Sequence, residues 1–273
     1  MMNFGYHAVY EKDYRSAITS AAQGGFQYVQ FDLDVPTFYL EALSKRQIND
    51  IKSVCADTHI NLSFHAPSDS IGLFTAAPLI RKGIHDHLKR ILQILNDLDA
   101  HHLTVHPLNP PSFRRADTLE DSFQQEYEEF YKDLFKSNLR QLTDIAGRVL
   151  IVIENLWLGP IANAALTELI HVGTDAFLTL DLAKMHKPGL IIDETQKAFF
   201  LKHKQRIREL HLHDFDEKGH SHLSPGQGQL NFASLFKDFY NEYQWLTIEV
   251  RPFNEALKAK AIFKDMIEKT EGT

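Results

Sequence analysis

Short apolar runs that end in a histidine or an acidic residue recur along this chain, and this pattern restricts its fold more than any other feature. The six clearest runs are NLSFHAP (His65), HLTVHP (His106), VLIVIEN (Glu154), FLTLDLAK (Asp181), RELHLHD (His211, His213) and WLTIEV (Glu249). A parallel barrel gathers the carboxyl ends of its strands on one face. If these runs are such strands, potential metal ligands far apart in sequence meet there.

The apolar runs alternate with amphipathic stretches of helical periodicity, which is typical of repeated strand–helix units. We expect strands at 3–8, 27–33, 60–65, 102–106, 149–154, 176–181, 207–213 and 245–250. We expect helices at 13–23, 45–58, 79–99, 119–146, 161–171, 192–205, 231–241 and 254–269. Eight such pairs predict an α/β fold, a (β/α)8 TIM barrel with parallel strands and outer helices, as a single domain over residues 1–273. An open doubly wound sheet is the competing fold, but it binds ligands near one switch point, whereas here potential ligands follow six strands.

Composition narrows the class of protein further. The chain is 44% hydrophobic with a net charge of −7, which gives no basic footprint for nucleic acid. Its single cysteine, Cys55, excludes an intramolecular disulfide and fits a reducing compartment. The first residues, MMNFGYHAVYEKDYR, lack the pattern of a signal peptide, and no apolar run approaches the roughly 18 residues of a membrane span. We therefore expect a cytoplasmic protein with a small-molecule substrate and without a membrane or nucleic-acid partner. Its oligomeric state is not predicted.

The strand-end residues form a set of ligands that suits a divalent metal ion. Glu154, Asp181, His211 and Glu249 together are a hard, oxygen-rich set that fits Zn²⁺, Mn²⁺, Mg²⁺ or Co²⁺. Each of them alone could equally be a solvated strand-end residue or a helix N-cap. His65 and His106 could hold a second ion together with Glu154, because a carboxylate can bridge two ions. Paired ions are the usual device for phosphoester hydrolysis.

Further polar residues lie close to these ligands in the sequence. His213 shares a strand face with His211, and Asp214 could orient an imidazole. The loop 218–229 carries two more histidines, of which we expect His222 to bind metal. The residues that we expect to contact substrate are His213, Lys184, Arg251, Trp157 and His220. For each of these the alternative is structural: a solvated loop, an ion pair or, for Trp157, a cap on the barrel core rather than a wall for a sugar ring.

The order of these motifs, from FHAP to IEVRP, resembles the xylose-isomerase-like TIM-barrel superfamily, which includes sugar and sugar-phosphate isomerases and epimerases as well as the endonuclease IV enzymes. The resemblance implies that Glu154, Asp181, His211 and Glu249 are the shared metal ligands and that the two glutamates move protons. It also implies that His65, His106 and His222 match further zinc ligands of endonuclease IV.

Three positions depart from the patterns of this superfamily. Lys184 stands where a histidine is common in both branches, and His220 stands where endonuclease IV has an aspartate. Glu217 stands where the epimerases have an arginine. The first two departures argue against a third zinc site like that of endonuclease IV in this chain. The third argues against a ketohexose pocket like that of the epimerases.

Three functions are consistent with the sequence. The first is a divalent-metal-dependent isomerase or epimerase of a small sugar, sugar phosphate or polyol-type substrate, with Glu154 and Glu249 transferring protons over a metal-stabilised enediolate. The alternative is an endonuclease IV-like multinuclear zinc phosphodiesterase, favoured by the surplus of histidines. A non-catalytic binding protein would have incomplete metal coordination.

Overall fold

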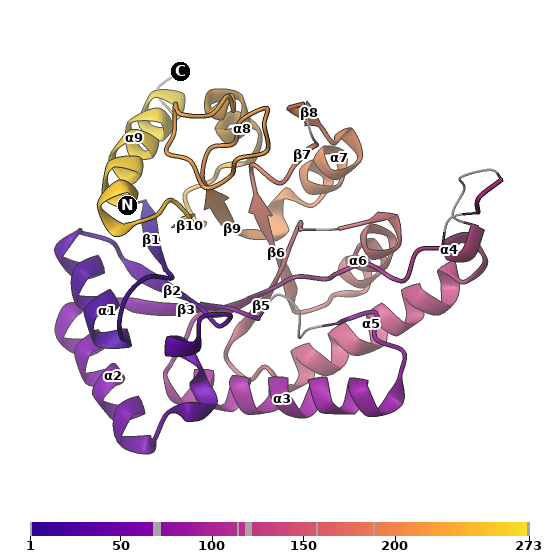
Figure 1. The fold of residues 1–273 in the computed structure, drawn as a ribbon, viewed down its shortest axis with the longest axis horizontal. Coiled ribbons are helices and arrows are strands. Elements are labelled where there is room, and N and C mark those ends of the chain that lie inside the picture. Colours follow the sequence, from indigo (N-terminus) through magenta and orange to yellow (C-terminus); the bar gives the residue numbers. More distant parts are fainter. Residues whose placement is uncertain are drawn as a thin grey trace.

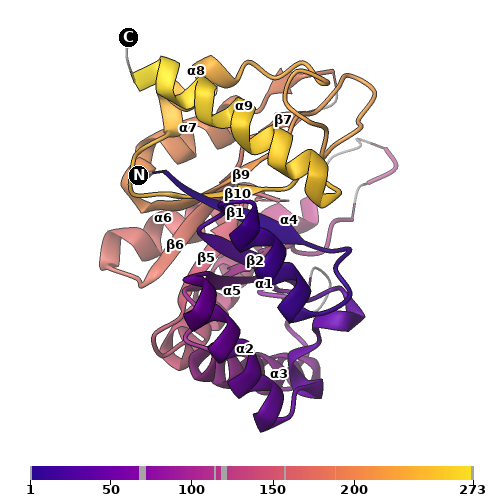
Figure 2. The same ribbon diagram turned by 90° about the vertical axis from the view of Figure 1, so that its left-hand side faces the viewer.

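The computed structural model of the chain describes residues 2–67, 72–113, 115–117, 122–156, 158–187 and 189–271. In this part of the chain, eight parallel strands close into a barrel in the order β1-β10-β9-β6-β5-β4-β3-β2. These strands are β1 (Asn3–Ala8), β2 (Tyr28–Asp32), β3 (Asn61–His65), β4 (His102–Val105), β5 (Leu150–Glu154), β6 (Ala176–Asp181), β9 (Ile207–Leu212) and β10 (Trp245–Ile248). Helices surround the strands as an outer ring (Figures 1 and 2). The prediction of a (β/α)8 TIM barrel is confirmed.

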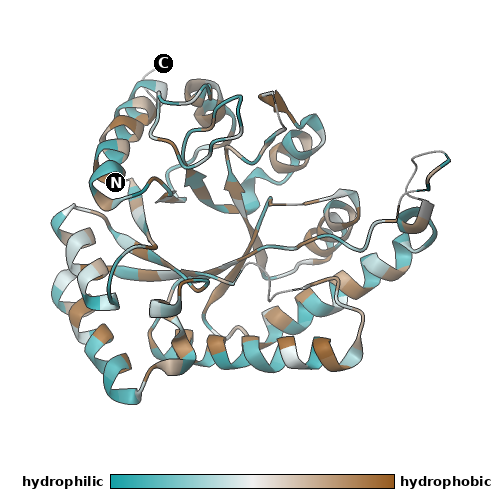
Figure 3. Ribbon diagram, viewed as in Figure 1, coloured by the Kyte–Doolittle hydropathy of each residue, from teal (hydrophilic) through white to brown (hydrophobic). Residues whose placement is uncertain are grey.

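The outer ring consists of helices that follow the barrel strands. They are α1 (Tyr14–Gln23), α2 (Lys45–Thr58), α3 (Pro78–Asp97), α4 (Ser122–Glu126), α5 (Glu128–Ile145), α6 (Pro160–Val172), α7 (Glu194–Lys202), α8 (Phe232–Phe239) and α9 (Phe253–Glu271), with short 3₁₀ turns at Pro36–Phe38, Leu40–Ala42 and Lys204–Arg206. Their ribbons alternate between hydrophobic and hydrophilic residues (Figure 3), as expected of helices that pack one face against the barrel. None of the helices in the described ranges combines the length and the apolar character needed to cross a membrane.

Local sequence signals explain where several helices begin. Asp13 accepts a hydrogen bond from the Ser16 N–H at 2.7 Å and so caps α1. Ser44 and Gln47 form a capping box at the start of α2. Both caps satisfy backbone N–H groups that have no partner within the helix.

The structure differs from the predicted elements in three places, one of which is the helix predicted at 192–205: it ends at Lys202 and is followed by a 3₁₀ turn at Lys204–Arg206. Residues 119–121 of the helix predicted at 119–146 lie outside the described residues, and the rest is divided into α4 and α5, because Tyr127 leaves the helical conformation with φ −107° and ψ 17°. A small antiparallel hairpin, β7 (His186–Lys187) and β8 (Ile191–Ile192), follows β6. Its strands are too short to leave a periodic pattern in the sequence.

The interior of the barrel is polar, whereas branched apolar side chains usually fill a TIM barrel. Glu209, on β9, is fully buried and lies at the centre of this interior. Its carboxylate accepts hydrogen bonds from Gln30, Thr104, Thr179 and Thr247 at 2.6–2.8 Å. Because alternate residues of a strand point to the same face, His211 also points into the barrel, one layer closer to the carboxyl ends of the strands.

Candidate metal centre

The carboxyl ends of the barrel strands bring histidines and carboxylates together at one mouth. Three groups of side chains have ligand atoms within 4.8 Å of one another: His65, His106 and Glu154; Glu154, Asp181 and His211; and His213, His222 and Glu249. Glu154 belongs to two groups, and Glu249 Oε1 lies 3.3 Å from His211 Nδ1. All the residues predicted as metal ligands therefore lie in one connected cluster.

The first group joins β3 and the segment after β4 to the end of β5. The Nε2 atoms of His65 and His106 lie 3.1 Å apart, and Glu154 Oε2 lies 3.1 and 2.9 Å from them. His65 Nδ1 donates to the Ala66 carbonyl at 2.9 Å, which turns Nε2 toward the group. Three ligands of a tetrahedral zinc ion are roughly 3.3 Å apart, given Zn–N bonds of about 2.0–2.1 Å. The spacing of this group fits such an ion.

The second group contains a lysine as well as ligands. Asp181 is fully buried, and its Oδ1 accepts hydrogen bonds from the backbone N–H groups of Ala183 and Lys184 at 2.8 and 3.1 Å. The Lys184 ammonium lies 2.9 Å from Asp181 Oδ2 and 2.5 Å from Glu154 Oε1. His211 Nδ1 faces the same space, 3.6 Å from Glu154 Oε1. The site therefore presents carboxylate oxygens to a cation, and the cation supplied by this chain is Lys184.

Glu209 supports this second group from inside the barrel. Its Oε2 lies 3.2 Å from His211 Nε2, and its Oε1 lies 3.1 Å from His102 Nε2. A carboxylate behind a metal-binding histidine commonly holds the ring so that the other nitrogen faces the ion. Here that other nitrogen is Nδ1 of His211. The sequence analysis missed Glu209, although its position two residues before His211 on a strand places both side chains on one face.

The third group depends on the loop 218–229. His213 Nε2 lies 3.2 Å from Asp181 Oδ2, and the His222 backbone N–H donates to His213 Nδ1 at 3.0 Å. His222 Nδ1 lies 3.7 Å from Glu249 Oε2. Because His222 is half-buried, with 32% of its side chain exposed, it borders on solvent at the mouth.

Asp214 anchors this loop and does not orient an imidazole as the sequence suggested. Its carboxylate accepts hydrogen bonds from the backbone N–H groups of Gly226, Gly228 and Leu230 at 2.8–3.1 Å. A Cβ atom on Gly228 would lie 2.4 Å from Asp214 Oδ1, so only glycine permits this approach. Gly226 has φ +88°, a conformation that also favours glycine. The glycines of the loop thus serve its attachment to β9.

Charges within the cluster determine its protonation state. Burial opposes a charge on Lys184, yet the Asp181 and Glu154 carboxylates raise the pKa of its ammonium well above the usual value. Burial likewise opposes a charge on His211, but Glu249 and Glu209 raise the pKa of its imidazole. Although burial acts to raise the pKa of Glu154, Lys184 and His211 lower it well below the ordinary range. Without metal, the carboxylates are thus ionised and cations of the protein compensate them.

The donor atoms of the cluster suit a divalent ion. In the described parts of the chain, Nδ1 of His211 and Oε2 of Glu249 have no hydrogen-bond partner, whereas His211 Nε2 faces the Glu209 carboxylate. Buried polar atoms without partners are rare in folded proteins, and an ion is one explanation for them. Carboxylate oxygens with imidazole nitrogens suit Mn²⁺, Co²⁺ or Zn²⁺. Residues Glu154, Asp181, His211 and Glu249 are therefore the ones that would hold such an ion.

The residues expected to contact substrate are distributed differently. His213 and Lys184 lie within the cluster, whereas the His220 side chain is 66% exposed and pairs with Asp216 at 2.8 Å. Arg251 donates from its guanidinium to His7 Nδ1 at 2.7 Å. Trp157 lies outside the described residues, so the apolar wall that we expected from it stays a prediction.

Two more residues at the mouth escaped the sequence analysis. His7 follows the strand-end rule on β1, and Asp32 follows it on β2. His7 Nε2 lies 3.5 Å from Asp32 Oδ2, and its Nδ1 lies 3.7 Å from Glu249 Oε1. Applying the rule to the runs GYHA and QFDL would have found both residues.

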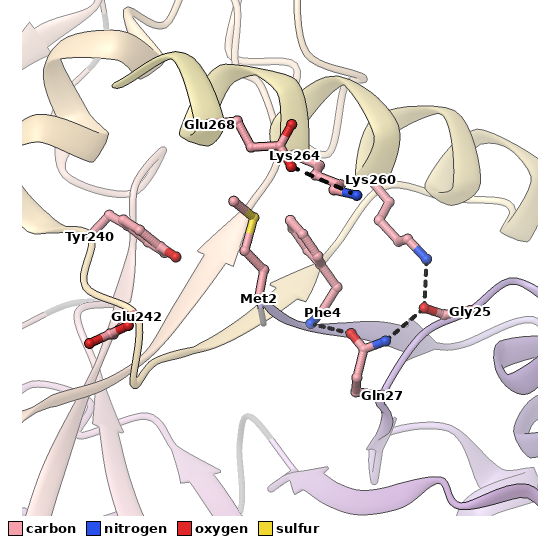
Figure 4. A pocket seen from close by; sticks show the side chains of 9 residues that line it. All are labelled: Met2, Phe4, Gly25, Gln27, Tyr240, Glu242, Lys260, Lys264 and Glu268. Atoms are coloured by element: carbon pink, nitrogen blue, oxygen red, sulfur yellow. Dashed lines mark hydrogen bonds and ion pairs between the residues drawn. The ribbon is translucent and has the colours of Figure 1, made fainter. Parts of the chain in front are cut away.

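A cavity of about 580 Å³ lies at the other end of the barrel, where the strands begin. Phe4, Gln27, Lys260 and Lys264 line it together with other residues (Figure 4). Several of its polar groups pair with one another: Lys260 Nζ donates to the Gly25 carbonyl at 2.7 Å, and Phe4 N–H donates to Gln27 at 2.9 Å. Since active sites of TIM barrels lie at the carboxyl ends of the strands, this cavity is not the site of chemistry.

Comparison with known proteins agrees with this architecture. The sequence profile of the family described as "Xylose isomerase-like TIM barrel" matches residues 18–269. The chain belongs to this family. An uncharacterized protein of Methanocaldococcus jannaschii is 26% identical over 186 residues. These residues make up 66% of each of the two chains, so this chain spans slightly less than two thirds of that curated relative.

Solved structures share the fold at low sequence identity. A D-tagatose 3-epimerase-like protein superposes with a TM-score of 0.74 at 20% identity, covering 99% of each chain. A D-psicose 3-epimerase from Clostridium cellulolyticum H10, solved with D-tagatose, superposes with a TM-score of 0.71 at 17% identity, covering 97% of this chain and 99% of its own. At these identities the likeness establishes the fold.

Proposed function

We propose that this protein is a divalent-metal-dependent isomerase or epimerase that acts on a small sugar, sugar phosphate or related polyol. Support comes from its family and from the likeness of its fold to proteins described as sugar 3-epimerases. The observation that carries the proposal is that two buried glutamates, Glu154 and Glu249, place carboxylate oxygens 3.6 and 3.3 Å from His211 Nδ1. Such a pair can deliver and remove protons at one small substrate.

The ligands in this proposal are Glu154, Asp181, His211 and Glu249. A divalent ion bound by them would polarise a substrate carbonyl or hydroxyl and stabilise the negative charge that develops when a proton leaves carbon. Glu209 keeps the His211 ring turned toward this position, and the turn after β6 fixes Asp181. These contacts pre-organise the site before substrate enters.

Glu154 and Glu249 have different surroundings and therefore suit different steps. Burial acts to raise the pKa of Glu249, but His211 and Lys184 lower it well below its usual range, so its carboxylate is ionised and able to accept a proton. Its Oε2 has no hydrogen-bond partner in the described parts of the chain. The Oε2 of Glu154 is held by His65 and His106, and its Oε1 faces Lys184. The two imidazoles on Oε2 can relay a proton through Glu154 back to the substrate.

One observation favours a second candidate function. The group of His65, His106 and Glu154 has the spacing of a further zinc site, which a single-ion isomerase does not need. Two ions bridged by Glu154 would suit hydrolysis of a phosphodiester. The number of bound ions separates the candidates: one per chain favours the isomerase, and two or three favour the phosphodiesterase.

Solvent exchange tests the proposal directly. The metal-loaded protein is incubated in D₂O with a panel of ketoses, aldoses and their phosphates, and NMR follows deuterium at carbon. We expect incorporation into at least one compound, reduced about 10²–10⁴-fold in Glu154→Gln and Glu249→Gln and unchanged in Glu126→Gln, an exposed control. Cleavage of bis(p-nitrophenyl) phosphate without exchange in any sugar would contradict the isomerase and favour the second function.

A further inference from the structure

The Lys184 ammonium lies between two carboxylates at the ends of β5 and β6, in the position of a bound cation. It contacts Asp181 Oδ2 at 2.9 Å and Glu154 Oε1 at 2.5 Å, and both carboxylates are fully buried. These are strong interactions, because hydrogen bonds between ionised groups are about twice as strong as neutral ones. Glu154 Oε1 also lies 3.6 Å from His211 Nδ1, so the ammonium borders the space that this nitrogen faces.

Each carboxylate is fixed through its other oxygen, independently of the lysine ammonium. Asp181 Oδ1 accepts two backbone N–H groups from the turn after β6, at 2.8 and 3.1 Å. Glu154 Oε2 lies between the imidazoles of His65 and His106, at 3.1 and 2.9 Å. The geometry of the two carboxylates therefore does not require the ammonium to stay. This arrangement is expected of a cation site whose occupant can exchange.

An ammonium and a divalent ion cannot share this space. An ion bound by Glu154, Asp181 and His211 would use the oxygens that now contact Lys184, and like charges a few ångströms apart repel strongly in a buried site. The lysine has a route out, since 24% of its side chain is exposed and its stem is long and flexible.

We propose that Lys184 is an exchangeable internal cation, which neutralises Glu154 and Asp181 in the metal-free protein and leaves them when a divalent ion binds. This inference rests on the proposed metal site. Lys184 then competes with the ion and stabilises the metal-free protein. Loss of the ammonium consequently acts in opposite directions on metal affinity and on metal-free stability.

The test compares full-length wild type with Lys184→Met, Lys184→Arg and Lys89→Met, the last an exposed lysine of α3 that controls for loss of charge. Isothermal titration with MnCl₂ gives the dissociation constant, and thermal unfolding in EDTA gives the metal-free midpoint. We expect Lys184→Met to bind Mn²⁺ at least tenfold more tightly than wild type, about 1.4 kcal/mol, while its midpoint in EDTA falls. Lys184→Arg keeps a cation, and its affinity should not exceed that of wild type.

The outcomes separate this inference from the proposed function. Equal or weaker Mn²⁺ binding by Lys184→Met, with wild type still binding, overturns the exchange and leaves the metal site in place. Failure of both proteins to bind any Mn²⁺ or Zn²⁺ overturns the metal site itself. If Lys184→Met unfolds in EDTA, purification with MnCl₂ and competition against a chelator still give its affinity. The tightening should disappear in an Asp181→Asn background, because Asp181 belongs only to the exchanging site.

Discussion

Replacing Glu209 by glutamine should destabilise the protein more than any surface change of the same kind. The Glu209 carboxylate faces Gln30, His102 and Thr247 with one oxygen, and with the other it faces two threonine hydroxyls and the His211 ring. Either orientation of the new amide turns its NH₂ group toward three donors. Breaking a buried charged pair costs about 3–5 kcal/mol, which corresponds to a midpoint lower by about 6–20 °C at about 2–4 °C per kcal/mol.

Thermal and urea unfolding of Glu209→Gln, beside the exposed control Glu126→Gln, measures this effect. The pH dependence has a defined sign. Burial acts to raise the pKa of Glu209, but His102 and His211 hold it well below its usual value of 4.5, so the charge stabilises the folded protein above that pH. The difference in unfolding free energy between wild type and Glu209→Gln should narrow as the pH falls from 4.5 toward the lower pKa of Glu209 in the folded protein. A loss below about 0.5 kcal/mol at neutral pH, the usual range of surface changes, would refute the role given to Glu209.

Three further predictions concern the loop, the cysteine and the metal. Asp214→Ala removes the acceptor of the Gly226, Gly228 and Leu230 N–H groups. The free energy of unfolding should therefore fall by about 2–4 kcal/mol, and amide hydrogen exchange should rise in 218–229. Unchanged exchange there would contradict the anchoring. Burial raises the pKa of Cys55 to about 12, so its thiolate fraction at pH 8, and its rate with Ellman's reagent, should be about a thousandfold below those of the unfolded chain; equal rates would refute this. When the free metal concentration is about 100 times Kd, adding EDTA should lower the unfolding midpoint by about 5–11 °C. No shift would mean that the ion does not favour the folded state.

The strand-end rule carried most of what the sequence could reveal about the site. Strands and helices were readable because their periodicities differ, and the parallel order then required that Glu154, Asp181 and His211 meet. His7 and Asp32 obey the same rule and could have been named from it.

Other features were less accessible because they depend on three-dimensional contacts. The position of the Lys184 ammonium depends on the rotamer of a flexible side chain in a turn, which no sequence spacing determines. His220 and His222 have the same residue type two positions apart, yet the anchored loop turns one toward solvent and the other toward Glu249. The network around Glu209 joins five strands, and only its position relative to His211 was visible beforehand.

The most direct test of the metal centre is a crystal structure of the protein grown with MnCl₂ or ZnCl₂, with anomalous difference maps recorded at the absorption edge of the metal. We predict a peak at the carboxyl-end mouth of the barrel, within about 2.0–2.3 Å of ligand atoms from Glu154, Asp181, His211 and Glu249. Maps without a peak at these four residues, or with the ion bound only elsewhere, would contradict the account.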